Sequence, residues 1–330
     1  MSKEPMREVY IYPTHNPEKD KTGNNYILFF HNAFKRKHLV KNRFGRFGML
    51  GLFFNLSAEV FIFHWVDLII AKQKGLLQSV LFLLGVALLK LMGKKVVWVL
   101  HNKKPHRSKS RIALLCMSYI AKRSDVVITH SNEGLSYVEE MYGEAVKERT
   151  FYIPHPVYTS RMFPSKEIVW DIIVWGTIER YKNILPFIEL VRKNEELRKL
   201  KILICGKCPD PEYGKLIKER KTNNITFLDE FLQEEQLIDF IAQSKVILFT
   251  YRLDSVLSSG ALVYSLNFNK RIVGPYGGAF KDLQPIVSCY KNFEDIAHIE
   301  CDGAVEVDLI GAYVRDNTWE VLPDKIDSLL

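Results

Sequence analysis

Two basic side chains lie just beyond an apolar run in the middle of the chain. Residues 170–176, WDIIVWG, have the length and composition of a buried strand, and Arg180 and Lys182 follow it closely. Gly176 would let the backbone approach a ligand. A forked guanidinium next to a compact ammonium suits a diphosphate, whose charge is spread over several oxygens. We therefore predict a phosphate site at Gly176, Arg180 and Lys182, with both basic side chains accessible to solvent.

A second motif of the same kind occurs later in the chain. Ser258, Ser259 and Gly260 directly precede an apolar segment with helical spacing. A helix N-terminus built from small residues presents free backbone N–H groups and the positive end of the helix dipole, and both favour phosphate. Serine also caps many ordinary helices, so this motif alone would be weak. Together, the two motifs predict that the second half of the chain binds phosphate groups.

Histidines follow the strand-like runs of the first half. His64 lies near the end of AEVFIFHW, and His101 and Asn102 end KKVVWVLHN, with His106 a few residues on. Imidazole can accept a proton from a hydroxyl group near neutral pH, but a histidine at a strand end often only hydrogen-bonds to a loop. We predict His101 as a catalytic base, with this structural role as the alternative. His64, Asn102 and His106 are expected to line the ligand site, and His155, between two prolines, is expected to be structural.

These residues are positioned by an alternation of strand-like and helix-like segments. In the first half, strand-like runs at 58–65, 94–102 and 124–131 are separated by helical patterns at 75–93 and 109–123. Strand, helix and strand in succession predict a parallel sheet with right-handed crossovers.

The alternation stops at a segment with three prolines, 149–168, which we interpret as a connection between domains. It then restarts, with strands expected at 170–176, 200–206, 245–251 and 271–275, and with ITFLDEF, 225–231, between the second and third of these. Near the N-terminus, VYIYP, 9–13, is a candidate for the first strand of the chain. A chain of 330 residues also exceeds the size at which one core usually stops growing. We predict an α/β fold of two doubly wound, Rossmann-like domains, 1–155 and 156–315, facing each other across a ligand-binding cleft.

The composition, with 47% hydrophobic and 25% charged residues, excludes disordered and collagen-like proteins. The five cysteines are scattered, and Cys205 and Cys208 form a lone C-x-x-C without a second pair or a histidine cluster, so we predict no metal site. The segment 75–93 is strongly apolar, but its uncharged stretch is shorter than the roughly 20 residues that a membrane span needs. We predict a buried or half-buried helix there.

Much of the formal net charge of +8 comes from residues 35–47, KRKHLVKNRFGRF, which contain six Lys or Arg and no acidic residue. No nucleic-acid module or zinc-finger spacing is recognisable, so we predict no nucleic-acid partner. Phe44 and Phe47 interleave the charges as in an interfacial helix, which favours an anionic membrane surface as the partner. A solvated basic face is the alternative.

Five motifs, in their order and spacing, resemble those of glycosyltransferases with the GT-B fold, especially the family 4-like bacterial enzymes that build exopolysaccharide, capsule and lipopolysaccharide. VLHNKKPH is similar to an H-N-x-x-P-H loop, YIPHPVY to the interdomain segment, and GTIERYKN to G-x-I-R-x-Y-K-G. SSGALVYSLNFNKRIVGP is similar to N-S-G-A-L-x-x-A-L-x-x-G-K-P-V-I-x-P, and NTWEVLPDKIDSLL to a closing S-W-x-x-I-A helix. The resemblance implies the GT-B fold, with a C-terminal helix at 316–330 that packs back toward the first domain.

The resemblance also implies an activity, namely transfer of a hexose from a nucleotide diphosphate sugar to a glycan or lipid-linked acceptor. Arg180 and Lys182 would hold the donor diphosphate and stabilise the leaving nucleotide. The backbone at Ser258, Ser259 and Gly260 would hold the same phosphates. No cofactor and no metal are expected, because the nucleotide sugar is a co-substrate.

The chain departs from the family at a pair of glutamates that many retaining members carry, since the matching positions fall near Val256 and Tyr264. Mannosyltransferase-like members also lack the pair, which favours an inverting enzyme that uses GDP-mannose. UDP-sugars together remain the larger class of donors. Inversion requires a carboxylate base, for which Asp67 is the better placed candidate and Glu133 a rival.

The resemblance assigns the first domain to the acceptor. Because the N-terminus is polar and carries no secretory signal, we expect a cytoplasmic protein, peripheral on the inner face of the plasma membrane. The main alternative is a non-catalytic protein that binds nucleotides or sugar phosphates and retains the fold. A GT-B epimerase or phosphorylase is disfavoured because the chain lacks the additional sequence for a larger site.

Overall fold

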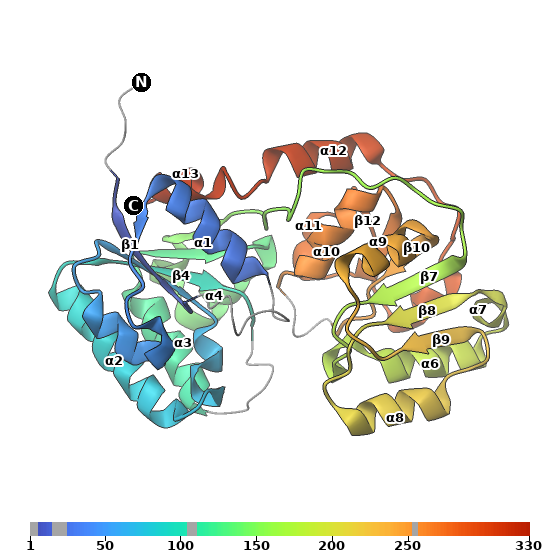
Figure 1. Ribbon diagram of the computed structural model, residues 1–330, viewed down its shortest axis with the longest axis horizontal. Helices are drawn as coiled ribbons and strands as arrows, with labels where there is room; N and C mark the ends of the chain where they lie inside the picture. The colour runs from blue at the N-terminus through green and yellow to red at the C-terminus, as the bar shows by residue number, and fades with distance from the viewer. Residues whose placement is uncertain (1–5, 15–24, 104–110, 253–256) are drawn as a thin grey trace. The chain divides into compact units, whose positions relative to one another are not determined.

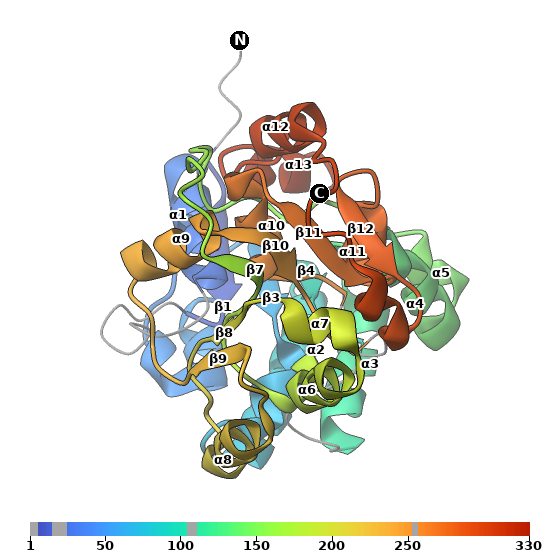
Figure 2. The same cartoon turned by 90° about the vertical axis from the view of Figure 1, so that its right-hand side faces the viewer.

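The computed structural model describes residues 6–14, 25–103, 111–252 and 257–330, and the chain divides into two compact units (Figures 1 and 2). Unit 1 comprises Met1–Pro156 and Asn317–Leu330, and unit 2 comprises Val157–Asp316. Each unit contains a six-stranded parallel sheet, which confirms the predicted α/β fold class with two sheets. No helix within the described ranges is long and apolar enough to cross a membrane.

Unit 1 is built on the strand order β2-β1-β3-β4-β5-β6. Its strands are β1 (Glu8–Tyr12), β2 (Leu39–Val40), β3 (Val60–His64), β4 (Lys95–Leu100), β5 (Val126–Thr129) and β6 (Thr150–Tyr152). Its helices are α1 (Tyr26–Lys37), η1 (Gly45–Phe54), η2 (Val66–Ala71), α2 (Gly75–Leu91), α3 (Arg111–Arg123), α4 (Asn132–Tyr142), α5 (Glu144–Lys147) and α13 (Leu322–Asp327).

Alternate side chains of these strands point to opposite faces of the sheet and bury both. Val9 and Ile11 of β1 pack in a core cluster with α1 and α13. On the other face, Phe63 of β3 meets Phe82 of α2, with ring centres 5.6 Å apart. Figure 1 shows α1 and α13 on one side of this sheet and α2 and α3 on the other.

Unit 2 has the order β12-β11-β10-β7-β8-β9. Its strands are β7 (Trp170–Trp175), β8 (Ile202–Cys205), β9 (Ile225–Leu228), β10 (Ser244–Leu248), β11 (Arg271–Pro275) and β12 (Val287–Tyr290). Its helices are η3 (Arg180–Lys182), α6 (Ile184–Lys193), α7 (Glu195–Lys199), α8 (Pro211–Arg220), α9 (Glu234–Ala242), α10 (Gly260–Ser265), η4 (Leu266–Phe268), α11 (Gly278–Asp282), η5 (Phe293–His298) and α12 (Val307–Asp316).

The two faces of this second sheet are also both covered. Ile173 and Leu203 pack in one core cluster with residues of α10 and α12. Ile172 and Ile202, the preceding residues of the same strands, pack in the other cluster with α6 and α8. The near-continuous apolar runs of the sequence are explained by this burial on both faces.

Three short strands lie where no strand was predicted, namely β2, β6 and β12. The strand β6 lies inside the segment 149–168 that was interpreted as a connection, so the start of that segment was wrong. Thr150 pairs with Val127 of β5 before the first proline of the segment is reached. Prolines only prevent pairing at their own positions, so a strand fits in front of them.

The basic segment 35–47 does not form the interfacial helix that was predicted. Its first residues end α1, its middle forms β2, and its last residues begin η1. Lys37 forms ion pairs with Asp324 and Asp327, and Lys41 forms one with Glu8. Part of the charge of this segment is therefore neutralised inside unit 1, because the sheet places it against acidic residues distant in sequence.

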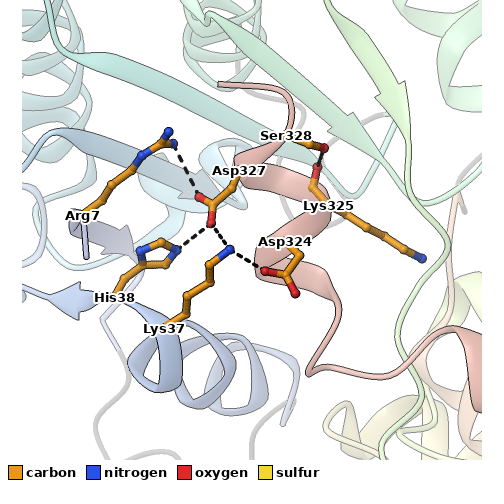
Figure 3. Close-up of polar contacts among 7 residues, drawn as sticks. All are labelled: Arg7, Lys37, His38, Asp324, Lys325, Asp327 and Ser328. Carbon is orange, nitrogen blue, oxygen red and sulfur yellow. Dashed lines mark hydrogen bonds and ion pairs between the residues drawn. The ribbon is translucent and has the colours of Figure 1, made fainter. Parts of the chain in front are cut away.

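The C-terminal segment belongs to unit 1, where Trp319, Leu322 and Ile326 pack in the core. The Asp327 side chain is only 8% exposed and has three basic partners (Figure 3). Its Oδ2 lies 2.8 Å from Lys37 Nζ and 3.0 Å from His38 Nε2, and its Oδ1 lies 3.6 Å from Arg7 Nη1. These contacts hold α13 against α1 and β1.

Candidate functional site

The carboxyl end of the sheet in unit 2 carries the first group of candidate residues. The strand β7 lies between β10 and β8. The chain continues from β7 to β8 on one side and from β10 to β11 on the other, so the two connections diverge at the boundary between β7 and β10. Open parallel sheets bind ligands at such switch points, beyond the carboxyl ends of the strands. The loop with Gly176 and Lys182 follows β7, and the loop with Tyr251 follows β10.

Lys182 is 3% exposed, so the prediction that its side chain is accessible to solvent was wrong. Its Nζ donates a hydrogen bond to the backbone oxygen of Trp175 at 3.1 Å and lies 5.4 Å from the ring centre of Tyr251. Burial lowers the pKa of Lys182 to about 8, and the nearby Glu179 opposes this only in part. A buried ammonium whose charge is incompletely compensated is suited to receive an anion.

Gly176 makes room for this ammonium. Its φ of 93° lies in the region that L side chains rarely adopt, and a Cβ at this position would lie 2.9 Å from Lys182 Nζ. At the end of the neighbouring strand β8, a Cβ on Gly206 would lie 2.3 Å from the backbone oxygen of Gly176. Side chains are therefore excluded at the ends of both strands.

Arg180 lies in the same turn as Lys182 but has a different environment. Its Nε and Nη2 donate to Asp210 Oδ2 at 3.0 and 2.7 Å, and its guanidinium lies 4.8 Å from the ring centre of Tyr213. The Arg180 side chain is 62% exposed. The structure thus brings Lys182 into the switch point, whereas the tip of Arg180 is engaged on the surface by Asp210.

The serine motif forms the start of α10. The Ser259 hydroxyl accepts a hydrogen bond from the backbone N–H of Leu262 at 3.2 Å and is the N-cap, while Ser258 precedes it and is half-buried. A Cβ on Gly260 would lie 2.5 Å from the Tyr158 hydroxyl oxygen. Because α10 spans only Gly260–Ser265, the contribution of its dipole is smaller than the sequence suggested.

The C-x-x-C motif does not bring its thiols together. Cys205 and Cys208 are free and buried, and they pack in different core clusters of unit 2. Among the residues that the structure describes, no group of three or more His, Cys, Asp or Glu side chains could hold a metal ion.

The second group of candidates lies in unit 1, where four histidines occupy the carboxyl ends of four neighbouring strands. His64 is the last residue of β3, His101 and His130 directly follow β4 and β5, and His155 follows β6. All four are at most 8% exposed, and their rings surround Tyr26 of α1 with ring centres within 5.7 Å of it.

These imidazoles are neutral at pH 7. His64 Nδ1 lies 3.0 Å from His101 Nε2, and desolvation together with the neighbouring histidines keeps the pKa of both well below 6.5. Burial also lowers the pKa of His130 to about 4. The lowered pKa makes His101 a weaker base than a free imidazole, and its role as the catalytic base stays a prediction. His64 is fully buried, so it positions His101 instead of lining an open site as predicted.

Asp67 lies in η2, directly after β3, and is 4% exposed. Asn102 Nδ2 donates to its Oδ2 at 3.3 Å. Burial raises the pKa of Asp67 to about 6, and the hydrogen bond from Asn102 opposes the shift. At neutral pH this side chain is ionised yet much more basic than an ordinary carboxylate, which is the property that a general base needs.

Glu133, the rival carboxylate, lies in the first turn of α4 and forms an ion pair with Lys103. Its charge is already matched by this ammonium, whereas among the residues that the structure describes the hydrogen-bond partner of Asp67 outside its own residue is the neutral Asn102. The local geometry therefore favours Asp67.

Three other residues singled out in the sequence are His106, Val256 and Tyr264. His106 and Val256 lie outside the described residues. Tyr264, the position that the resemblance matched to a glutamate, lies on α10, and its hydroxyl donates to Glu234 Oε1 at 3.5 Å. Its ring packs against Trp175, with ring centres 5.6 Å apart.

Sequence reasoning missed Tyr26, His130 and Tyr251. His130 directly follows a strand-like run, as His101 does, so the same rule could have found it. Tyr26 and Tyr251 give no such signal, because only the packing of α1 and of the loop after β10 brings their rings to the strand ends.

No protein-family model matches the chain, and no curated protein matches its sequence. Solved structures match it over nearly its whole length. The structure of Anabaena Alr3699/HepE in complex with UDP is similar with a TM-score of 0.67 at 11% identity, covering 98% of this chain and 99% of that one.

Two other solved structures are named as glycosyltransferases. AviGT4, involved in avilamycin A biosynthesis, has a TM-score of 0.60 at 13% identity, over 98% of this chain and 96% of that one. The lipopolysaccharide outer core galactosyltransferase WaaB, in its apo form, has a TM-score of 0.58 at 11% identity, over 98% and 100%. At such identities the similarity establishes the fold, and this chain has the GT-B fold that its sequence motifs predicted.

Proposed function

We propose that this protein is a glycosyltransferase that moves a hexose from a nucleotide diphosphate sugar to a hydroxyl group of an acceptor. The observation that carries the proposal is the buried ammonium of Lys182 at the switch point of unit 2. When the bond between the anomeric carbon and the phosphate oxygen breaks, the leaving nucleoside diphosphate gains negative charge. A fixed positive charge in a dry site stabilises that charge far more than one in water.

The donor half-site would consist of Lys182, the backbone around Gly176, and the start of α10 at Ser258, Ser259 and Gly260. Arg180 is proposed as a second diphosphate contact, for which phosphate has to replace Asp210 as its partner. An ion pair this exposed to solvent contributes little to stability, so replacing Asp210 by phosphate costs little. Two neighbouring structures contain UDP or UDP-glucose, which supports a UDP-sugar as donor, with GDP-mannose as the second candidate.

The acceptor half-site would lie at the strand ends of unit 1. As the acceptor oxygen bonds to the anomeric carbon, its proton passes to the Asp67 carboxylate, which is the role of the base in an inverting reaction. Asn102 orients this carboxylate, and His101, neutral and held by His64, can hydrogen-bond to a sugar hydroxyl. No metal is needed in this scheme, because Lys182 supplies the positive charge.

The acceptor is proposed to be a glycan or a lipid-linked sugar of bacterial surface polysaccharide. The support is the similarity to WaaB, which is named as a lipopolysaccharide galactosyltransferase. The five thiols, all free, agree with a cytoplasmic location on the inner side of the membrane where nucleotide sugars are used.

The proposal is tested first at the donor half-site, by thermal unfolding of the protein with UDP, GDP, CMP, ADP and their sugar conjugates. A ligand at about a hundredfold over its Kd stabilises by about 2.7 kcal/mol, which is a shift of several degrees. We expect one nucleotide to give this shift in the wild type and in Lys193→Met, an exposed lysine of α6, but not in Lys182→Met. No shift with any nucleotide would contradict the proposal.

A non-catalytic binding protein is the second candidate. At the position that the resemblance matched to a glutamate, this chain has Tyr264, whose hydroxyl donates a hydrogen bond to Glu234. This second candidate predicts the same thermal shift, but no release of nucleoside diphosphate when donor and a bacterial glycan or lipid extract are supplied together. Release that depends on the extract would exclude it.

A further inference from the structure

The loop that follows β10 contacts the basic turn 180–182 through three consecutive residues. Thr250 Oγ1 donates a hydrogen bond to the backbone oxygen of Lys182, and the backbone N–H of Arg252 donates to the backbone oxygen of Tyr181 at 3.0 Å. Between these two contacts, the ring of Tyr251 faces the Lys182 ammonium, with Nζ 5.4 Å from the ring centre. The exit loops of β7 and β10 are therefore joined at the switch point by Tyr251 and its two neighbours.

Packing on several sides fixes the position of the Tyr251 ring. Tyr251 is 4% exposed, and its hydroxyl is hydrogen-bonded with the hydroxyl of Ser259, the cap of α10. The aromatic rings that surround it, with ring centres between 5.4 and 5.8 Å away, are those of Tyr181, Phe249 and Phe280. A ring held in this way has little freedom to move off the ammonium, so its contact with Lys182 is preorganised.

The partner that Tyr251 offers to the ammonium is attractive but uncharged. Burial keeps the pKa of the Tyr251 phenol well above its usual range, so the phenol is neutral, and the face of the ring attracts a cation more strongly where water is excluded. A carboxylate in the same place would neutralise Lys182 and repel a phosphate. The ring leaves the charge in place and occupies none of the three N–H donors of the ammonium, of which the Trp175 oxygen accepts one.

Two titratable groups also act on Lys182, one from the same turn and one from β8. The Glu179 carboxylate favours the charged form of Lys182, whereas Cys205 at the end of β8 has a neutral thiol, because burial raises its pKa to about 12. The titratable groups that act on the phenol of Tyr251 itself are Tyr181 and Tyr290. Glu179 and the aromatic ring thus favour the charged form of Lys182, while burial opposes it.

We propose that Tyr251 is a positioning residue, which holds the charged side chain of Lys182 toward the diphosphate of the donor. The inference rests on the proposed function, because it gives Tyr251 a task at the donor half-site. Through its hydroxyl the same side chain also connects Lys182 with Ser259, which belong to the two motifs that the sequence singled out for phosphate. Without the ring, the ammonium should lose its proton more easily, and the site should bind a diphosphate less well as the pH rises.

Titration of Lys182 in the free protein tests the first of these effects. In protein isotope-labelled at the lysine ε-carbon, the NMR signal that is absent from Lys182→Met reports Lys182, and in the wild type we expect it to titrate near pH 8. Tyr251→Leu should lower the pKa of Lys182 by about one unit, whereas Tyr251→Phe, which keeps the ring, should stay within about half a unit of the wild type. The matched control is Tyr276→Leu, which removes another ring of unit 2, 5.3 Å from Lys281 Nζ, and should leave the pKa of Lys182 unchanged.

Calorimetric titration with inorganic pyrophosphate, which has the diphosphate chemistry common to all the nucleotides, tests the second effect. If only the charged ammonium binds, a pKa that is lower by about one unit reduces the affinity about twofold at pH 7 but about tenfold at pH 9. The affinity of Tyr251→Leu, relative to the wild type, should therefore fall by a further factor of about five between these pH values. Tyr251→Phe and Tyr276→Leu should follow the wild type. A side chain that only supports the fold would weaken binding by the same factor at both pH values.

Because Tyr251 is buried, Tyr251→Met is measured beside Tyr251→Leu as a longer and more adaptable replacement, and thermal unfolding establishes that each variant is folded. A Lys182 pKa in these variants that equals or exceeds the wild-type value would overturn the proposal, even if the wild type binds pyrophosphate. So would a loss of affinity that does not depend on pH, or a Tyr251→Phe protein that behaves like Tyr251→Leu. Failure of the wild type to bind pyrophosphate, with the pKa lowered as expected, would instead refute the donor half-site on which the inference rests.

Discussion

Replacement of Lys182 by methionine should stabilise the protein and remove its response to the donor nucleotide. In the folded protein the pKa of Lys182 is about 8, against 10.5 for a free lysine. Each unit of pKa corresponds to about 1.4 kcal/mol, so at pH 7 burial of this ammonium costs about 3 kcal/mol. Methionine has a similar length and no charge, and removes that cost.

The gain is reduced by one lost hydrogen bond. Lys182 Nζ donates to the backbone oxygen of Trp175, a contact that contributes about 1 kcal/mol. The net expectation for Lys182→Met is about 2 kcal/mol of added stability at pH 7, or roughly 5 °C in Tm for a unit of this size. Sites that bind charge commonly trade stability for function in this way.

The pH dependence of this difference has a defined sign. Below pH 8 Lys182 is charged in both the folded and unfolded states, so its burial cost is present in full. Between pH 8 and 10.5 the folded state loses the proton while the unfolded state keeps it, so the wild type gains stability as the pH rises. The advantage of Lys182→Met should therefore shrink from pH 7 to pH 10.

Differential scanning calorimetry at several pH values, with and without the nucleotide that shifts the wild type, measures both effects. Lys193→Met, which removes an exposed lysine, should change Tm by little at any pH. A Lys182→Met protein that is less stable than the wild type at pH 7 would refute the burial argument. A normal nucleotide shift in that variant would refute the assignment of Lys182 to the donor.

Three further changes have expected outcomes. Asp67→Asn should lower the transfer rate by 10² or more, whereas the rate of Glu133→Gln should stay within about tenfold of the wild-type rate. The wild-type rate should also fall as the pH drops through about 6, where Asp67 gains a proton. A pH–rate profile of each protein measures both effects. Gly176→Ala should lower Tm by a few degrees and weaken nucleotide binding in calorimetric titration. The φ of residue 176 is strained for alanine, and the added Cβ displaces the Lys182 ammonium. Unchanged binding would contradict the proposed site. Asp327→Ala should lower the free energy of unfolding, measured in urea, by about 2 kcal/mol. The Asp324 side chain is 67% exposed, so Asp324→Ala should lower it by less than about 0.5 kcal/mol. Equal losses would refute the role of the buried Asp327 carboxylate.

The strands that position the candidate site could be predicted from sequence, since each is a β-branched run buried on both faces. The exceptions have local causes. The strand β12 carries Ser288 and Cys289 in its middle, and β6 is followed at once by proline-rich sequence, so neither reads as an apolar run. Local pattern is a poor guide where a strand is short and lies at the edge of its sheet.

The environments of the charged residues could not be predicted, because they depend on contacts between distant segments. Arg180 and Lys182 are two residues apart, yet one is exposed and the other buried beneath the loop that carries Tyr251. Likewise, the charge of Lys37 is compensated by Asp327, nearly three hundred residues later. Spacing along the chain identifies such groups, but only the fold determines which of them are desolvated.

The measurement that tests the central claim most directly is donor turnover. Wild-type protein, Asp67→Asn and Lys182→Met are incubated with the nucleotide sugar that gives the thermal shift and with a bacterial lipid and glycan extract, and release of nucleoside diphosphate is followed by phosphorus NMR. We predict release by the wild type that requires the extract, strongly reduced release by Asp67→Asn, and none above background by Lys182→Met. A wild-type protein that binds the donor but never releases nucleoside diphosphate, with any of the sugars and extracts supplied, would contradict the account.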